Sequence, residues 1–248
     1  MRLQSLPPNS RASSSIMSCA LALTLLGVLS VPTVQAADGD VPPTPTNATT
    51  QDFENDTVDT SPDGLLSGRA GRGGGNANWK IVSAADAPSG SKVLGQLDAQ
   101  KLSARYPHVT KTDLFAADVD VSVKFKTVTG GLDQAAGIVF RYRDSKTYHV
   151  VRASAVDGNV VAFRTELGQP ANLGVKGKKT AYGFKTRVLP RRWNTLRVIA
   201  QGPLIQVFFN GKKLFEVEDD SYVGSGGVGL WTRADSVVYF DDFAAAEL

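Results

Sequence analysis

Apolar and polar residues alternate with a period of two along most of this chain, and this alternation limits the fold more than any other feature. In the run 118–126, valine or phenylalanine takes every second position, and aspartate, serine or lysine takes the positions between. This is the pattern of a β-strand that buries one face. Similar short runs follow at 137–143, 148–154, 159–166, 193–200, 204–209, 213–217, 228–232 and 237–243. Because no segment shows a sustained helical period with capping residues, we expect strands joined by turns to form the core.

Turn residues separate these runs and favour antiparallel pairing. Asn210-Gly211 lies between two apolar runs, and both residues tolerate the positive φ that a two-residue type I′ hairpin requires. Gln201-Gly202-Pro203 is also typical of a turn. Many short antiparallel strands without helices predict an all-β sandwich or barrel.

The first 36 residues have the pattern of a bacterial-type secretory signal peptide. Arg2 and Arg11 form a basic start, the run 19–31 is apolar, and Val34-Gln35-Ala36 is a small-residue cleavage site. The apolar run is shorter than the roughly 20 residues that cross a bilayer, and no second such run follows. We therefore expect a mature chain that starts near Ala37, has no membrane span and is exported to the periplasm or the outside of the cell.

Removal of this peptide would also remove Cys19 and both methionines. The mature chain would then have no thiol, which excludes a disulfide framework, a cysteine nucleophile and a thiolate metal site. Acidic and basic residues nearly balance, at 24 and 27 in the whole chain, so we expect no nucleic-acid partner. No helical partner surface or long hydrophobic patch is evident, and we expect a monomer.

The segment that follows the predicted signal peptide differs in composition from the rest of the chain. Residues 37–50 are rich in Pro, Thr, Ala and Asp and have no apolar period, which is typical of a spacer. From residue 51 to residue 248 we expect one domain. A chain of this length buries roughly 70% of the surface that it exposes when unfolded.

The order of motifs in this domain resembles that of concanavalin A-like jelly-roll domains. The likeness is carried by GIVFRYRDSKTYHVVRASAVDGNVVAFR at 137–164, Trp193 with the apolar residues after it, the NGKKLFEV hairpin, and GGVGLWTRADSVVYFDDF before the end of the chain. Phe53-Glu54-Asn55-Asp56 and Trp79-Lys80-Ile81-Val82 also look like the first strands of such domains. The chain looks most like laminin-G-like and 3-keto-disaccharide hydrolase-type domains of secreted bacterial proteins. The resemblance implies a β-sandwich of two antiparallel sheets, in a superfamily of lectins, glycan hydrolases and structural modules.

The acidic residues do not match the catalytic pattern of family 16 glycan hydrolases on this fold. Those enzymes carry E-x-D-x-x-E on one strand, so that the carboxylates share one face. Residues 216–220 read EVEDD directly after a hairpin, which favours a solvated turn. His108 and His149 are the only histidines, and we interpret His149 as a half-buried strand residue rather than part of a two-histidine site. The resemblance alone leaves open a glycoside hydrolase or lyase, including one that acts on 3-keto-glycosides.

Arginines on neighbouring strands form a candidate binding face. If Ile138, Phe140 and Tyr142 face the core, alternation places Arg141 and Arg143 on the opposite face. A hairpin at 144–147 would then put Tyr148 and Arg152 on that same face. Arginine donates paired hydrogen bonds to hydroxyl or carboxylate groups, and aromatic rings stack on the C–H face of a sugar. These residues predict polar and stacking contacts on the concave sheet of a jelly roll.

Three further residues complete the predicted face. Arg164 would join from the following strand, and Trp231 and Arg233 would form a rim. We therefore predict an exported, non-catalytic glycan-binding β-sandwich. Two alternatives stay open. One is the glycoside hydrolase or lyase, and the other is a structural or adhesion module without a small ligand, in which the arginines would be spread and paired with surface acids and no cleft would exist. The binding residues also have a plainer interpretation, in which the arginines only solvate an exposed sheet face and Trp231 lies in the core.

Asp241 and Asp242 are the candidate metal ligands. Jelly-roll domains of this type hold a structural calcium through a late-strand acidic residue and backbone carbonyls, and calcium takes hard oxygen ligands. A surface charge explains the pair equally well, and alternation does not decide which of the two aspartates is buried. We retain a structural calcium at this pair as an expectation.

Overall fold

Strands make up all the regular secondary structure in the computed structural model, which describes residues 41–73, 75–178 and 182–248. The predicted signal peptide, residues 1–36, lies outside the described residues. The described residues fall within one compact unit, 38–248. This part of the chain contains no helix long and apolar enough to cross a membrane.

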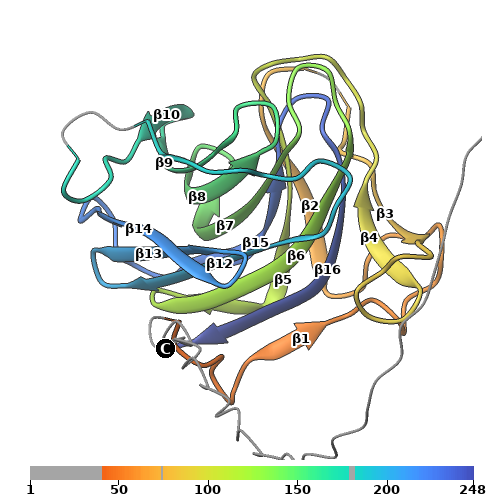
Figure 1. Cartoon of the computed structure of the whole chain (residues 1–248), viewed down its shortest axis with the longest axis horizontal. Coiled ribbons are helices and arrows are strands. Elements are labelled where there is room, and N and C mark those ends of the chain that lie inside the picture. The colour runs from red at the N-terminus through yellow and green to blue at the C-terminus, as the bar shows by residue number, and fades with distance from the viewer. Residues whose placement is uncertain (1–40, 74, 179–181) are drawn as a thin grey trace, which may run out of the picture. The chain divides into compact units, whose positions relative to one another are not determined.

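One sheet, here sheet A, contains eight strands in the order β14-β13-β12-β6-β16-β4-β3, with β1 also paired to β16 (Figure 1). Every pairing in it is antiparallel. The strands are β14 (Lys212–Glu218), β13 (Leu204–Phe209), β12 (Asn194–Gln201), β6 (Val119–Thr129), β16 (Val237–Glu247), β4 (Lys92–Gln96), β3 (Trp79–Ser83) and β1 (Thr49–Gln51).

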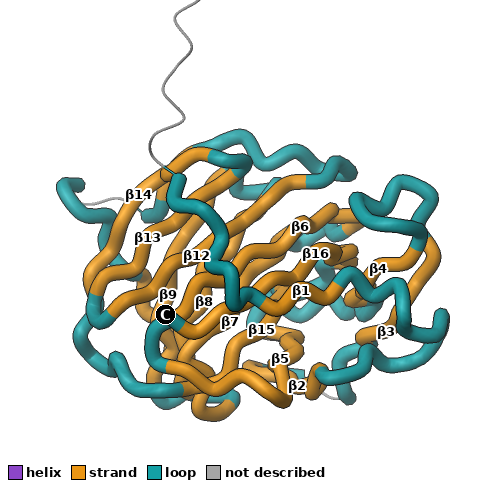
Figure 2. Tube along the Cα trace, turned by 90° about the horizontal axis from the view of Figure 1, so that it is seen from below, coloured by secondary structure: helices purple, strands orange, loops and turns teal. Residues whose placement is uncertain are grey.

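The second sheet, sheet B, also contains eight antiparallel strands, in the order β10-β9-β8-β7-β15-β5-β2, with β11 paired to β9. Figure 2 shows the two sheets as separate layers. The strands are β10 (Gln169–Asn172), β9 (Asn159–Glu166), β8 (Thr147–Ser154), β7 (Ala135–Asp144), β15 (Gly226–Thr232), β5 (Arg105–Ala116), β2 (Leu65–Gly71) and β11 (Phe184–Lys185). The predicted all-β sandwich of two antiparallel sheets is confirmed.

Alternation builds the core between the sheets. Val121, Val123 and Phe125 of β6 are buried in one cluster with Ile138 and Phe140 of β7. The period of two seen in the sequence therefore marks the inward face of each sheet. Burying apolar area at about 25 cal/mol per Å² is the main favourable contribution to folding here.

Sheet B carries a second apolar cluster on its other face. Tyr148 and Val150 of β8 are buried there with Trp231 of β15, and Tyr106 and Phe163 pack against them. These residues alternate in sequence with inward-facing ones, such as Val151 next to Val150. Both faces of sheet B are therefore apolar in part, and the outer one carries the candidate site.

The predicted hairpin at Asn210-Gly211 is confirmed. Both residues have positive φ, 47° and 74°, and Phe209 of β13 pairs with Lys212 of β14 directly beside the turn. Asparagine and glycine are the residues that adopt this conformation at low cost.

Part of the predicted spacer lies against sheet A. Arg197 donates to the carbonyl oxygens of Pro42 and Pro43, and Asn47 donates to the carbonyl of Glu247. Val41 and Thr44 lie beside Arg197 and Phe208 on the outer face of sheet A (Figure 2), and β1 then joins that sheet by pairing with β16. Arg197 holds this segment while its guanidinium also pairs with Asp120.

Candidate functional site

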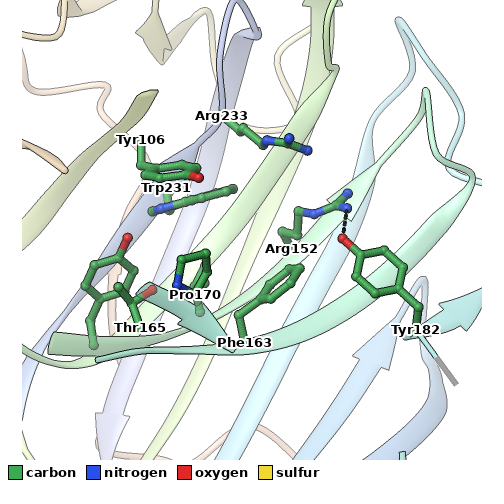
Figure 3. A pocket seen from close by; sticks show the side chains of 10 residues that line it. Tyr106, Arg152, Phe163, Thr165, Pro170, Tyr182, Trp231 and Arg233 are labelled. Atoms are coloured by element: carbon green, nitrogen blue, oxygen red, sulfur yellow. Dashed lines mark hydrogen bonds between the residues drawn. The ribbon is translucent and has the colours of Figure 1, made fainter. Parts of the chain in front are cut away.

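A cavity of about 120 Å³ lies on the outer face of sheet B. At about 10–15 Å³ for each water-sized group, this volume holds on the order of ten non-hydrogen atoms, which is close to the size of one pyranose ring. Figure 3 shows the side chains around it. Its lining residues are Tyr106, Tyr148, Val150, Arg152, Phe163, Thr165, Pro170, Tyr182, Trp231 and Arg233.

Strand pairing brings these residues together. Tyr148 lies opposite Thr165, and Val150 lies opposite Phe163, so that β8 and β9 present alternate residues to the cavity. Arg152 is the next residue of β8 on the same face. The period of two that forms the core therefore also builds the floor of the pocket.

Aromatic rings form one wall. Tyr106 stacks on Trp231, with ring centroids 5.5 Å apart and an interplanar angle of 15°. Trp231 lies opposite Gly137 of β7, where an added Cβ would come within 3.2 Å of the indole ring and 2.9 Å of the carbonyl oxygen of Val151. Gly137 thus leaves the space that Trp231 occupies against the sheet.

A hydrogen-bonded pair, His108 and Tyr142, packs beside Tyr148 of the lining. Tyr142 therefore lies on the outer face of sheet B, and its predicted place in the core is wrong. Nε2 of His108 lies 3.0 Å from the hydroxyl of Tyr142, and Nδ1 lies 3.3 Å from the carbonyl oxygen of Tyr106. Burial lowers the pKa of His108 to about 4, so this ring is neutral at pH 7. Because the carbonyl oxygen only accepts, Nδ1 carries the proton and Nε2 accepts from Tyr142. Burial also raises the pKa of Tyr148, which keeps that hydroxyl protonated.

Arg152 is 1% exposed and lies at one side of the cavity. Its Nη2 donates to Asp157 Oδ2 at 2.6 Å and to the Tyr182 hydroxyl at 3.3 Å (Figure 3). Its guanidinium also lies 5.7 Å from the ring centroid of Phe163. The cation is therefore held in place by an acid, a hydroxyl and an aromatic ring.

Arg233 follows β15 and lies near Arg152 in the view of Figure 3. Its Nη1 donates to Asp133 Oδ2 at 3.2 Å, and its Nε donates to the carbonyl oxygen of Ser103 at 3.2 Å. The side chain is 34% exposed. Arg233 is thus oriented by the protein but still reaches solvent at the pocket.

Four of the six predicted contact residues meet at this cavity: Tyr148, Arg152, Trp231 and Arg233. Their role as ligand contacts stays a prediction. Arg141 and Arg164 lie elsewhere, and the reasons differ.

The predicted placement of Arg141 on this face is wrong, because β7 contains a β-bulge. The pairing of β7 with β8 shifts between Phe140 and Asp144, and Arg141 has a positive φ of 48°. A bulge breaks the alternation of side chains. Arg141 is fully buried and donates to the carbonyl oxygens of Ala117 and Gly202.

Arg164 is also on the other face. It lies opposite His149, and its Nη1 donates to Asp219 Oδ1 at 2.8 Å. His149 Nε2 contacts the second oxygen of the same carboxylate at 2.8 Å. Burial acts to raise the pKa of Asp219, but hydrogen bonds from Ser221 and His149 outweigh it and leave that pKa below its usual value.

The two histidines do not form a shared site. His108 lies on the outer face of sheet B with Tyr142, and His149 stacks on Phe140 of the core. Burial lowers the pKa of His149 to about 4, against the opposite effect of Asp219. Each histidine is therefore a neutral, buried residue.

The acidic run 216–220 lies away from the pocket. Glu216 pairs with Lys213, and Glu218 pairs with Lys176. The predicted solvated turn is wrong for most of this run, because Glu216 and Glu218 lie in strand β14 and Asp219 is buried beside His149. No Asp or Glu of the described residues lines the pocket, so the two-carboxylate arrangement of glycoside hydrolases is not built there.

The contacts of Asp241 and Asp242 do not fit a calcium ion. The oxygens of Asp241 accept from the backbone N–H groups of Ser89 and Asp242. The oxygens of Asp242 accept from the Ser89 hydroxyl and from Lys124 Nζ, which is 2.6 Å away. All four oxygens thus face donors, one of them a cation. Burial raises the pKa of Asp241 to about 6, and among the described residues no group of three acidic, His or Cys side chains is placed to hold a metal.

Several residues that line the pocket are not among the contacts predicted from the sequence. Phe163 and Thr165 are the sequence neighbours of Arg164 in β9, so their side chains lie on the opposite face of the strand from Arg164. The turn at 155–158 pairs Ser154 with Asn159. Counting back from this pair places Phe163 opposite Val150 and Thr165 opposite Tyr148, so the position of the turn is a signal for these two residues. Tyr106, Pro170 and Tyr182 come from distant segments, and no local pattern marks them.

Two antiparallel sheets packed face to face, with a pocket on the outer face of one sheet, define a jelly-roll β-sandwich domain. The sequence profile of the 3-keto-alpha-glucoside-1,2-lyase-like domain matches residues 59–244, so this chain belongs to that family. No curated protein matches the sequence significantly.

Solved structures show the same fold at low sequence identity. Carbohydrate-binding module CBM66 from Bacillus subtilis is 15% identical, with a TM-score of 0.56 over 74% of this chain and 96% of the module. The GH43 protein BlXynB from Bacillus licheniformis is 14% identical, with a TM-score of 0.52 over 84% of this chain and 40% of that protein. The chain therefore corresponds to less than half of BlXynB and to nearly all of CBM66.

Proposed function

We propose that this protein is an exported, monomeric glycan-binding β-sandwich whose pocket on sheet B holds one sugar ring. The observation that carries the proposal is the composition of the pocket wall. Trp231, Tyr106 and Phe163 offer apolar ring surface, and Arg152 and Arg233 offer fixed donors. Binding sites for small polar ligands combine apolar walls with a few placed polar groups in this way. The fold shared with CBM66 supports the same reading.

Binding is favoured over hydrolysis because the lining contains no carboxylate. General acid and base catalysis of glycoside cleavage requires groups that exchange protons near neutral pH. The titratable lining residues are tyrosines and arginines. Burial raises the pKa of Tyr148, which makes that hydroxyl a poorer base at pH 7.

A lyase that acts on 3-keto-glycosides is the second candidate, since the chain belongs to the 3-keto-alpha-glucoside-1,2-lyase-like family. A 1,2-elimination beside a ketone needs a base for the proton on the adjacent carbon and an acid for the departing oxygen. The nearest carboxylates to the pocket arginines are those of Asp157 and Asp133, and both are engaged in salt bridges. Product analysis with a 3-keto-glucoside separates this candidate from binding alone.

The test is a titration of residues 37–248 with a panel of mono- and disaccharides. Binding is measured by tryptophan fluorescence and by thermal unfolding. A bound sugar should change the emission of Trp231 and raise the unfolding midpoint without being consumed. Trp231→Ala should abolish both effects. Trp193→Ala is the matched control, because Trp193 contacts Asp86 and Lys126 away from the pocket.

Each other result has a distinct meaning. Consumption of a glycoside, measured by chromatography, would replace the binding proposal with the enzyme. No midpoint shift and no product across the panel would favour the structural or adhesion module. Export is tested separately by the mass of the protein recovered outside the cytoplasm, which should correspond to a chain that starts near residue 37.

A further inference from the structure

We propose that the pocket on sheet B takes an acidic sugar, a uronic acid whose carboxylate binds at Arg233 and Arg152. This inference rests on the proposed glycan-binding function and names the ligand class for the same site. It follows from the charges of the lining, the free donors of the two arginines and the position of the aromatic wall.

The charges of the lining have one sign. Arg152 and Arg233 are its charged residues, and no Asp or Glu of the described residues belongs to it. Asp157 and Asp133 bind these arginines from outside the lining. The acids therefore hold the guanidinium groups in position, and the groups that meet a ligand are cationic.

Donor atoms are left over at both arginines. Arg233 uses Nε and Nη1 for Ser103 and Asp133, and Nη2 has no partner among the described residues. Arg152 uses Nη1 and Nη2 for Asn159, Asp157 and Tyr182, and its Nε likewise has none. A guanidinium presents its N–H groups in a planar fork that matches a carboxylate.

The arginines and the rings lie on different sides of the cavity. In Figure 3 the guanidinium groups of Arg233 and Arg152 are on the side of Tyr182, and the rings of Tyr106 and Trp231 are on the other side. A pyranose that packs its C–H face on the rings would direct one edge toward the arginines. In a uronic acid that edge carries the C6 carboxylate.

The shortage of strong side-chain acceptors in the lining favours an anionic sugar over a neutral one. Sugar hydroxyls both donate and accept, and sites for neutral sugars need strong side-chain acceptors as well as donors. The lining contains no Asp, Glu, Asn or Gln, and its side-chain acceptors are the hydroxyl groups of Thr165 and the tyrosines. A carboxylate only accepts, so it matches a lining that is rich in donors.

The experiment compares glucuronic acid, its neutral methyl ester and glucose by isothermal titration with the chain 37–248. Glucuronic acid should bind about tenfold or more tightly than the other two, the effect of one charge-assisted hydrogen bond. Raising the salt concentration from 20 mM to 300 mM should reduce this advantage. Arg233→Gln should lower the affinity for glucuronic acid about tenfold more than the affinity for glucose, so that the advantage disappears. Arg143→Gln, which changes an exposed arginine outside the pocket, should have no effect.

The outcomes separate this inference from the function on which it rests. If all three sugars bind equally well and Trp231→Ala abolishes binding of all three, the acidic-sugar inference is overturned and the glycan-binding function stands. If a 6-sulfated sugar binds more tightly than glucuronic acid, the carboxylate assignment is overturned. If none of the sugars binds, both the inference and the proposed function fall.

Discussion

Sheet B carries two pairs of arginines that differ in what their guanidinium groups contact. The pocket arginines, Arg152 and Arg233, each retain a nitrogen without a partner among the described residues. The interior arginines, Arg141 and Arg164, bind backbone carbonyls and the buried Asp219. They also have one nitrogen each without a partner in the described part of the chain, Nη1 of Arg141 and Nε of Arg164, but these atoms are buried and do not line the pocket. The same residue type on the same sheet therefore lines the pocket on one face and stabilises the fold on the other.

Strand geometry produces this difference. Arg152 lies on β8 in phase with Tyr148 and Val150, which face the cavity. Arg164 lies opposite His149 and is out of phase with Phe163. A shift of one residue moves a side chain to the other face of a sheet. Composition alone thus gives no assignment of function to an arginine on a sheet.

Arg141→Met should give the largest loss of stability. Removing the buried guanidinium leaves the carbonyl oxygens of Ala117 and Gly202 without this donor, and each buried acceptor left unsatisfied costs about 1–3 kcal/mol. Urea unfolding measures the effect. Arg143→Met, at an exposed neighbour, should cost less than about 1 kcal/mol. Sugar binding by the folded fraction of Arg141→Met should be normal, and a selective loss of binding would contradict the division into two pairs.

The second prediction concerns pH, because each region contains one buried histidine. The pKa values of His108 and His149 are lowered to about 4, below the ordinary value of about 6.5. Between these values the unfolded chain binds more protons than the folded chain, so the free energy of unfolding falls as the pH drops from about 6.5 to about 4.

Each histidine contributes at most about 3 kcal/mol to this fall. His108→Gln should remove the part that belongs to the pocket region, and His149→Gln should remove the part that belongs to the interior. The readout is the slope of unfolding free energy against pH, which separates this effect from the general loss of packing. A slope that neither substitution changes would refute the assignment.

Gly137→Ala should affect the pocket more than the interior. An added Cβ at Gly137 meets the indole of Trp231 at 3.2 Å and the carbonyl oxygen of Val151 at 2.9 Å, and overpacking of this kind costs about 1–3 kcal/mol. We expect altered tryptophan fluorescence and weaker sugar binding. Gly227→Ala is the control, since its nearest contacts are 3.6 Å or more. Unchanged binding in Gly137→Ala would show that Trp231 does not need this support.

Arg164→Met should have the smallest effect. Its side chain is 22% exposed and pairs with Asp219, which keeps its contacts with His149 and Ser221. A partly exposed ion pair contributes about 1 kcal/mol or less. Sugar affinity should not change in titrations. Loss of sugar binding in a folded Arg164→Met variant would show that Arg164 contributes to binding, as the sequence predicted.

Local sequence patterns are sufficient for the fold and for four of the ten residues that line the pocket. The alternation at 148–154 places Tyr148 and Arg152 on one face, and the turn before Asn159 fixes which residues of β9 join them. The bulge at Arg141 has no such signal, because the residue with φ of 48° is not glycine. It is stabilised by contacts with Ala117 and Gly202, which lie far away in the sequence.

The remaining part of the pocket depends on tertiary contacts. Tyr106 reaches Trp231 because β5 and β15 are neighbours in sheet B, and Tyr182 reaches Arg152 from a loop. Pairs of this kind are separated by many residues and have no period of their own. A single sequence therefore predicts the faces of each strand better than it predicts which strands are neighbours.

The hydrogen bonds from Arg197 to the carbonyl oxygens of Pro42 and Pro43 determine on which face of the domain the described chain begins. These hydrogen bonds lie on the outer face of sheet A, and the pocket lies on the outer face of sheet B. Val41, the first residue that the structure describes, therefore lies on the opposite side of the sandwich from the pocket. A chain immobilised through that end presents its pocket away from the support, so attachment and ligand capture do not compete for the same side of the molecule.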